Sequence, residues 1–283
     1  MNYVEVSGAR IRYHATGPSA GPPVVLLHGI GRSLEDWELQ HPRLPSTHRI
    51  ISLDMPGFGL SQRLPAVTSL SSLADGVWAI LSALAVEDPV HLMGNSLGGA
   101  VAMRMTVDDP GRVRTLTLVN SAGFGRTVTA ALRVLALPGV GRPLLRRMAD
   151  PRIARRTERS IFFDGALVTP SRIETAVKIA RQPDFAAVYL EAARALGGVR
   201  GVAPGWRREL LPRVAHLGKP TLLVWGSRDL ILPSAHLAAA RLAFPAARSH
   251  LFPDTGHMPQ IERPDEFAEV VRPLLAEAGS EVP

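Results

Sequence analysis

The stretch VHLMGNSLGGAVAMRM, residues 90–105, combines three signals that together decide the fold. An apolar run of strand length breaks at Gly94, and the apolar spacing of a helix begins directly after Ser96. The segment GNSLG at 94–98 fits the pattern G-x-S-x-G, in which glycines let the chain turn sharply and leave the serine hydroxyl exposed above a sheet. The alternative is an ordinary helix N-terminus that Ser96 caps. The pattern predicts a strand, a tight turn that carries a nucleophile, and a helix.

Further apolar runs of strand length lie on both sides of this stretch, and segments with helical spacing lie between them. Runs that are apolar on both faces are typical of buried parallel strands, and their alternation with helices predicts an α/β fold with helices on both faces of the sheet. The additional strand segments are 22–29, 48–54, 113–120, 220–226 and 247–252, with a hairpin at 2–7 and 10–15. The helical segments are 69–85, 97–107, 234–243 and 264–277.

The alternation stops between residues 123 and 212, where amphipathic helical patterns and Gly or Pro breaks occur without a convincing strand. We therefore expect a core of residues 1–122 and 213–283, with a helical cap, or lid, of residues 123–212 inserted into it. The segment 126–159 holds nine arginines against two acidic residues. We interpret it as a solvated basic face, and attraction of an anionic substrate or a membrane surface is the alternative.

The composition is that of a globular protein and excludes several classes. Of the 283 residues, 46% are hydrophobic and 20% are charged, and there is no cysteine to serve as a nucleophile or a thiolate ligand. No apolar run approaches the roughly 20 residues of a membrane span, and the N-terminus does not resemble a signal peptide. We expect a cytoplasmic protein without stable membrane insertion. Despite the net charge of +7, no aromatic residues interleave with the arginines, so we expect no nucleic acid partner; a homodimer is left open.

A serine hydroxyl needs a base to accept its proton and a carboxylate to orient that base. Among nine histidines, His257 lies in a glycine-preceded loop between the last strand and the C-terminal helix. Asp229 follows a buried strand, at the carboxyl edge where ligands meet catalytic groups, although it could instead cap the next helix. Two other positions could supply the acid. Asp254 is nearer His257 in sequence, but its short loop predicts a turn. Asn120, at the end of another strand, carries no charge. The predicted catalytic triad is Ser96, Asp229 and His257.

The loop HGIG, which begins at His28, is expected to stabilise the negative oxygen that forms when the hydroxyl attacks a carbonyl. Backbone N–H groups perform this role, and we expect those of Ile30 and Leu97 to form the oxyanion hole. Leu97 gains from the dipole of the helix that it begins. A plain glycine turn is the alternative. The adjoining residues that we expect to contact the substrate are Gly29, Asn95 and Met258.

These motifs resemble the α/β-hydrolase fold family almost from end to end. LLHGIGRSLEDW resembles the family's oxyanion loop, LDMPGFGLS its next loop, GNSLGG its nucleophile elbow, WGSRD its acid turn and GHMPQIERPDEF its histidine loop. The resemblance implies an eight-stranded, mostly parallel sheet with a helical cap inserted after the sixth strand. It also implies neither a metal ion nor an organic cofactor.

Ser96 separates the chain from the haloalkane dehalogenases and epoxide hydrolases of the same fold, which use aspartate as the nucleophile. The sequence thus predicts a carboxylic ester hydrolase that acts on a small molecule through an acyl-enzyme. GNSxGG also resembles the meta-cleavage-product hydrolases, so hydrolysis of a carbon–carbon bond in a vinylogous diketo acid is the alternative. Those enzymes carry tryptophan where this chain has Met258, and their lid arginine has no clean counterpart among Lys178 and Arg181. A ligand-binding protein without turnover on the same scaffold is a third hypothesis.

Overall fold

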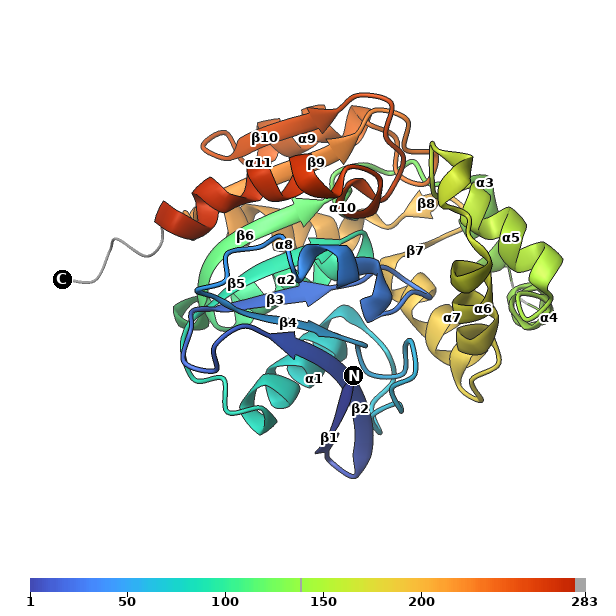
Figure 1. The fold of residues 1–283 in the computed structure, drawn as a ribbon. Helices are drawn as coiled ribbons and strands as arrows, with labels where there is room; N and C mark the ends of the chain where they lie inside the picture. The colour runs from blue at the N-terminus through green and yellow to red at the C-terminus, as the bar shows by residue number, and fades with distance from the viewer. Residues whose placement is uncertain (138, 278–283) are drawn as a thin grey trace.

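The computed structural model describes residues 1–137 and 139–277, so that 278–283 of the expected core and residue 138 of the expected cap lie outside it. Its centre is an eight-stranded sheet of order β1-β2-β4-β3-β5-β6-β9-β10 (Figure 1). Its strands are β1 Asn2–Val6, β2 Ala9–Thr16, β3 Pro23–Leu27, β4 Arg49–Leu53, β5 Val90–Asn95, β6 Val113–Val119, β9 Thr221–Gly226 and β10 Arg248–Phe252. β1 and β2 are antiparallel and the remaining strands are parallel to one another, which confirms the predicted mostly parallel sheet.

The central strands are buried because helices cover both faces of the sheet. Every residue of β3, β5 and β9 is buried, as their continuous apolar sequences predict. One face packs against α1 Leu70–Ala83, α2 Leu97–Asp108, α8 Pro204–His216 and α9 Ala235–Ala243. The other face packs against η1 Leu34–Gln40 and α11 Pro264–Glu277, beside which lies α10 Pro259–Glu262. The short turn η2 Pro110–Arg112 leads into β6.

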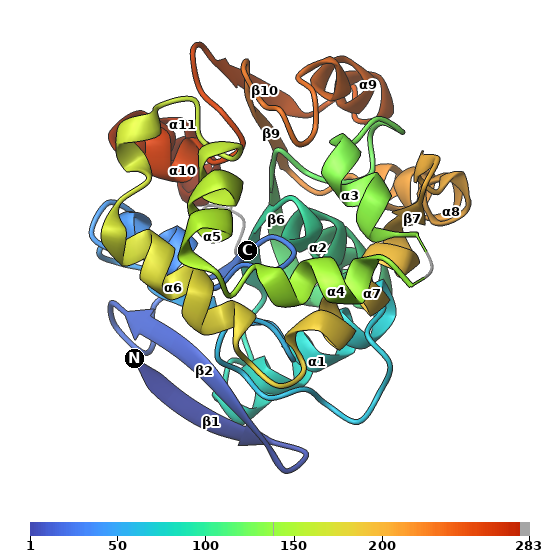
Figure 2. The same cartoon turned by 90° about the vertical axis from the view of Figure 1, so that its right-hand side faces the viewer.

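The segment between β6 and α8 is helical and lies beyond the carboxyl ends of β3, β5 and β6 (Figures 1 and 2). Its elements are α3 Ala130–Leu135, α4 Gly141–Arg147, α5 Pro151–Arg159, η3 Gly165–Leu167, α6 Pro170–Ala180 and α7 Phe185–Leu196, followed by the two-residue strands β7 Gly197–Gly198 and β8 Gly201–Val202. α8 runs across the expected boundary at 212/213 and packs against α2. The whole of α8 thus lies with the core, and the term cap is used below for residues 123–203.

The outer surface of the cap is basic. All nine arginines of the segment 126–159 are exposed, whereas Glu158 on α5 is buried. A solvated basic face fits this distribution, because long charged side chains on the outside of a helix keep their hydration. Within residues 1–137 and 139–277, no helix combines the length and the apolar character that crossing a bilayer requires.

A buried ion cluster fixes the loops at the carboxyl edge of the sheet. Arg12 Nε donates to Asp54 Oδ2 at 2.7 Å, and the terminal nitrogens of Arg12 donate to the two oxygens of Glu35, each at 2.7 Å. The other oxygen of Asp54 accepts from the Leu34 N–H at 2.8 Å. The loop after β4 and the segment that follows β3 are thereby joined beside the site described next.

Candidate active site

Ser96 occupies the turn between β5 and α2 in a strained conformation. Its φ of 55° and ψ of −115° lie outside the regions that L-residues commonly adopt, and its side chain makes no capping hydrogen bond. The hydroxyl therefore does not act as a helix cap. A Cβ on Gly98 would stand 2.3 Å from the Leu27 carbonyl oxygen and 2.7 Å from that of His28. Only glycine permits this approach, which brings the start of α2 against the loop after β3.

Asp229 and His257, which follow β9 and β10, meet in a buried pair. The His257 Nδ1 lies 2.7 Å from Asp229 Oδ2, and His257 is 4% exposed. Because Nδ1 faces a carboxylate it carries the proton, which leaves Nε2 free to accept one from an alcohol. The other oxygen of Asp229 accepts from the N–H groups of Ile231 and Leu232, at 2.7 and 3.0 Å. Asp229 does not cap the next helix, because α9 begins only at Ala235.

Asn120 is a member of the site that sequence reasoning missed. It follows β6 with a φ of 44°, and its Nδ2 donates to Asp229 Oδ2 at 2.6 Å. One carboxylate oxygen thus receives both the imidazole and an amide. The signal in the sequence is a polar side chain at the same sheet edge, although Asn120 carries no charge and cannot itself be the acid. Asp254 lies at the surface instead, where it pairs with Arg228 at 3.2 Å.

The N–H groups of Ile30 and Leu97 have no hydrogen-bond partner within the described part of the chain, and both residues line one cavity beside Ser96. Their loop is held by His28. The His28 Nε2 accepts from the Met55 N–H at 3.0 Å, so Nδ1 carries the proton and donates to the Gly29 carbonyl oxygen at 2.7 Å. Burial lowers the pKa of His28. The neutral ring thus holds the loop through these two hydrogen bonds.

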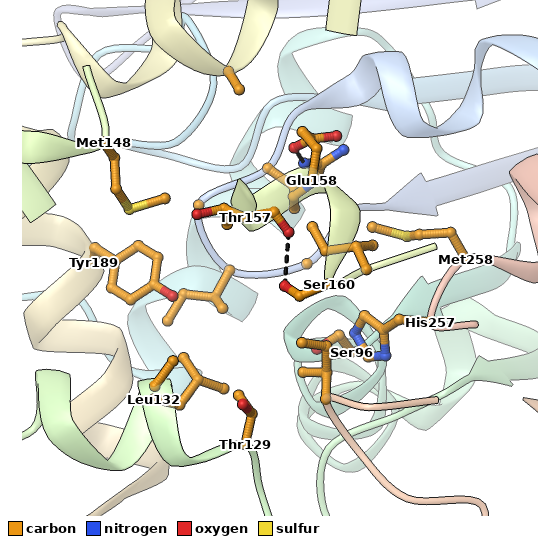
Figure 3. Close-up of a pocket in the computed structure, with 18 of the residues that line it drawn as sticks. Ser96, Thr129, Leu132, Met148, Thr157, Glu158, Ser160, Tyr189, His257 and Met258 are labelled. Carbon is orange, nitrogen blue, oxygen red and sulfur yellow. Dashed lines mark hydrogen bonds and ion pairs between the residues drawn. The ribbon is translucent and has the colours of Figure 1, made fainter. Parts of the chain in front are cut away.

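Two cavities meet at Ser96 beneath the cap. The larger, of about 170 Å³, includes His257 and Met258 on one side, with Tyr189 across from them (Figure 3). The smaller, of about 60 Å³, includes Leu97 but not His257. The expected contact residues all line the larger cavity; these are Gly29, Asn95 and Met258.

Asn95 also has a structural part in the site. Its side-chain amide donates to the carbonyl oxygen of His257 at 3.0 Å and to that of Val119 at 3.2 Å. The residue before the serine thus holds the backbone of the histidine loop.

An ion cluster at the top of the larger cavity joins the cap to the core. Arg32, in the loop after β3, binds both oxygens of Asp36 at 2.9 and 2.7 Å and also pairs with Glu158 of α5. Burial alone would lower the pKa of Arg32, but the two carboxylates outweigh it and raise that pKa. No local pattern could have revealed this contact, because Arg32 and Glu158 are 126 residues apart.

The cap is also bound to the histidine loop. The His257 N–H donates to the Ile161 carbonyl oxygen at 2.8 Å. The Glu262 carboxylate accepts from the N–H groups of Gly256 and Phe163, at 2.7 and 2.8 Å. Burial raises the pKa of Glu262. Two of the loops that bear the site therefore contact the same inserted segment.

No group of three or more His, Asp or Glu side chains that could hold a metal ion occurs among residues 1–137 and 139–277. The groups that the structure brings to the cavities at Ser96 are a hydroxyl, an imidazole with its carboxylate, and backbone amides. Arranged around Ser96, these groups are suited to acyl transfer.

Comparison with known proteins gives the same family from sequence and from structure. The chain is 31% identical over 275 residues to the dihydrolipoyllysine-residue acetyltransferase component of the acetoin cleaving system of Cupriavidus necator, covering 96% of this chain and 68% of that protein. It is 30% identical to 2-hydroxymuconate semialdehyde hydrolase of Pseudomonas sp. strain CF600, covering 98% and 94% of the two chains. A solved meta-cleavage product hydrolase of Pseudomonas fluorescens IP01 superposes with a TM-score of 0.81 at 26% identity, covering 98% of each chain. Since the model for the alpha/beta hydrolase fold matches residues 22–264, the chain belongs to the α/β-hydrolase fold family.

Proposed function

We propose that this α/β-family hydrolase cleaves an uncharged carboxylic ester through an acyl-enzyme on Ser96. The proposal is supported by the strained serine, the buried His257–Asp229 pair and the two free amides, which meet around cavities under the cap. In this mechanism Ser96 Oγ attacks the carbonyl carbon while His257 Nε2 takes the hydroxyl proton. The N–H groups of Ile30 and Leu97 stabilise the oxyanion.

Collapse of the tetrahedral intermediate breaks the bond to the leaving oxygen, which takes the proton from His257. Water then attacks the acyl-enzyme, with His257 as the base, and the acid is released while Ser96 regains its proton. Asp229 keeps the imidazole in the required tautomer and stabilises the imidazolium. Each proton thus moves between oxygen and one nitrogen of His257.

The two cavities suit the two halves of an ester. The leaving oxygen must lie near His257, which lines only the larger cavity, so we assign that cavity to the alcohol part. The acyl chain then occupies the smaller cavity, whose lining is apolar apart from Ser96. A water-sized group needs roughly 10–15 Å³. The smaller cavity, with a volume of about 60 Å³, therefore has room for only a few such groups and suits a short acyl chain.

The choice of an uncharged ester rests on one observation, which is that Arg32 is already paired with carboxylates of the protein. It is the one arginine or lysine among the described residues that line the larger cavity, and it is already bound by two buried carboxylates. A substrate carboxylate would find no free cation there, and burying an unpaired anion is costly. The nine arginines of the segment 126–159 are exposed on the outside of the cap instead.

The test is turnover of p-nitrophenyl butanoate combined with labelling by a fluorophosphonate probe. We expect stoichiometric labelling and steady hydrolysis, both abolished by Ser96→Ala and both retained by Ser82→Ala, which changes an exposed serine. Labelling without hydrolysis of short or medium acyl esters would contradict the ester assignment. An inert Ser96 would favour the ligand-binding protein.

A second candidate, hydrolysis of a carbon–carbon bond in a meta-cleavage product, is favoured by the names of two similar proteins. It uses the same serine and the same cavities. Rapid loss of the colour of a ring-fission product, together with no activity on the esters, would select it over the ester reaction.

A further inference from the structure

Tyr189 of α7 presents an unpartnered hydroxyl to the larger cavity. The residue is 7% exposed, and its hydroxyl has no hydrogen-bond partner among the residues that the structure describes. Figure 3 shows the oxygen pointing into the cavity, with Ser96 and His257 on the opposite side. A hydroxyl that opens into a cavity and makes no hydrogen bond within the described residues can donate one to a ligand there.

The ring of Tyr189 is held so firmly that the hydroxyl has a fixed position. A Cβ on Gly31, which has a φ of 67°, would stand 2.6 and 2.9 Å from two carbons of the ring. The ring also packs against Phe185, with centroids 5.8 Å apart, inside the apolar cluster of the cap. The hydroxyl is therefore pre-organised, and a substrate gains its hydrogen bond without ordering the side chain.

The hydroxyl is available as a donor. Burial raises the pKa of Tyr189, which keeps the phenol protonated. The nearby Ser160 differs, because its hydroxyl already donates to the Thr157 carbonyl oxygen at 2.7 Å (Figure 3). A substrate oxygen in this part of the cavity would thus be bound by Tyr189 rather than by Ser160.

The charges at the cavity favour an uncharged partner for Tyr189. Arg32 and Glu158 line the same cavity, and the guanidinium of Arg32 also pairs with Asp36, so the three groups together have a formal charge of −1, which disfavours an anion. We infer that Tyr189 is a specificity-determining residue that donates a hydrogen bond to an ether, carbonyl or hydroxyl oxygen in the alcohol part of the ester. The inference rests on the proposed function and adds the class of alcohol that the site selects.

Three isomeric esters that differ only in the place of one ether oxygen, with an alkyl and a carboxylate ester of equal length as references, test this inference. The set is hexyl, 2-propoxyethyl, 3-ethoxypropyl, 4-methoxybutyl and 4-carboxybutyl butanoate, with release of butanoic acid followed by pH-stat. The leaving chains have equal length, and the position of the ether oxygen locates the donor. The protein variants are Tyr189→Phe, which keeps the ring, and Tyr3→Phe, which makes the same change on a residue that is 45% exposed.

For one ether isomer we expect Tyr189→Phe to lower kcat/KM by about threefold to tenfold more than it does for hexyl butanoate, the range of one neutral hydrogen bond. Tyr3→Phe should leave that ratio unchanged. Equal losses on all esters, or a preference for the carboxylate ester, would overturn the inference while hydrolysis of hexyl butanoate upheld the proposed function. Failure of every ester and of fluorophosphonate labelling would instead overturn the proposed function itself.

Discussion

At the residue scale, one oxygen of Asp229 receives two donors. The imidazole of His257 and the amide of Asn120 reach Oδ2 at 2.7 and 2.6 Å. Two donors on one oxygen fix the direction of the carboxylate, and through it the plane of the imidazole. Asn120 does not line either cavity at Ser96, so it is a positioning residue.

Asn120→Ala should lower kcat by about tenfold with KM nearly unchanged, because a hydrogen bond to a charged group is lost away from the substrate. Asn120→Asp should lower kcat further, since it places a second carboxylate beside Asp229. Steady-state kinetics on p-nitrophenyl butanoate and the rate of fluorophosphonate labelling measure both effects. A kcat that Asn120→Ala leaves unchanged, or the reverse order of the two variants, would contradict this role.

The three residues of the predicted triad share one property, which is a place after the carboxyl end of a parallel strand of the sheet. Ser96, Asp229 and His257 follow β5, β9 and β10, and parallel strands bring their carboxyl ends to one edge. Glu158 has no such position. Its place at the cavity depends on how a cap helix packs across the chain, which no local pattern encodes.

At the scale of elements, the strands were predictable and the cap helices were less so. A strand such as β3 is buried on both faces, and its sequence is therefore a continuous apolar run that can be recognised without the structure. In α5 the buried residues are Ala154 and Glu158 only, so no apolar stripe marks the helix. The bounds of α5 therefore follow from tertiary contacts and not from a local apolar pattern.

Glu158 of α5 pairs with Arg32 of the core. We therefore expect two arginine substitutions, one at this pair and one at the surface, to lower the free energy of unfolding by different amounts. Arg32→Met leaves the buried Asp36 and Glu158 carboxylates without their partner and should lower the free energy of unfolding by about 3–5 kcal/mol. Arg213→Met removes an exposed pair with Glu209, at 3.1 Å, and should cost under about 1 kcal/mol. Urea unfolding followed by circular dichroism measures both. Equal costs would show that the Arg32 cluster does not hold the cap.

At the scale of the whole molecule, two buried histidines, His41 after η1 and His91 in β5, make stability depend on pH. Burial lowers the pKa of His41 from 6.5 to about 4 and that of His91 to about 3. His41 lies between the hydroxyls of Thr16 and Ser52, at 2.8 and 2.9 Å, and His91 contacts Thr115 at 2.9 Å. Both rings are neutral in the folded protein at neutral pH.

The unfolded chain binds more protons than the folded chain once the pH falls below 6.5, so stability should decline from there towards pH 4. Each of the two histidines contributes a slope of up to about 1.4 kcal/mol per pH unit. Urea midpoints at pH 7.0, 6.0 and 5.0 measure the decline, and the double variant His41→Asn, His91→Gln should make it less steep, while His28, whose pKa burial also lowers, keeps part of it. A slope that the double variant does not change would refute the assignment to these rings.

Because the backbone at Ser96 is strained, selection for stability and selection for catalytic activity favour different residues at this position. A non-glycine residue with this φ and ψ costs about 1–3 kcal/mol, which a glycine at the same position would largely recover. That exchange would remove the nucleophile. A thermostability screen of this chain that measured only the amount of folded protein would therefore enrich inactive variants. Each round of such a screen must also measure catalytic activity.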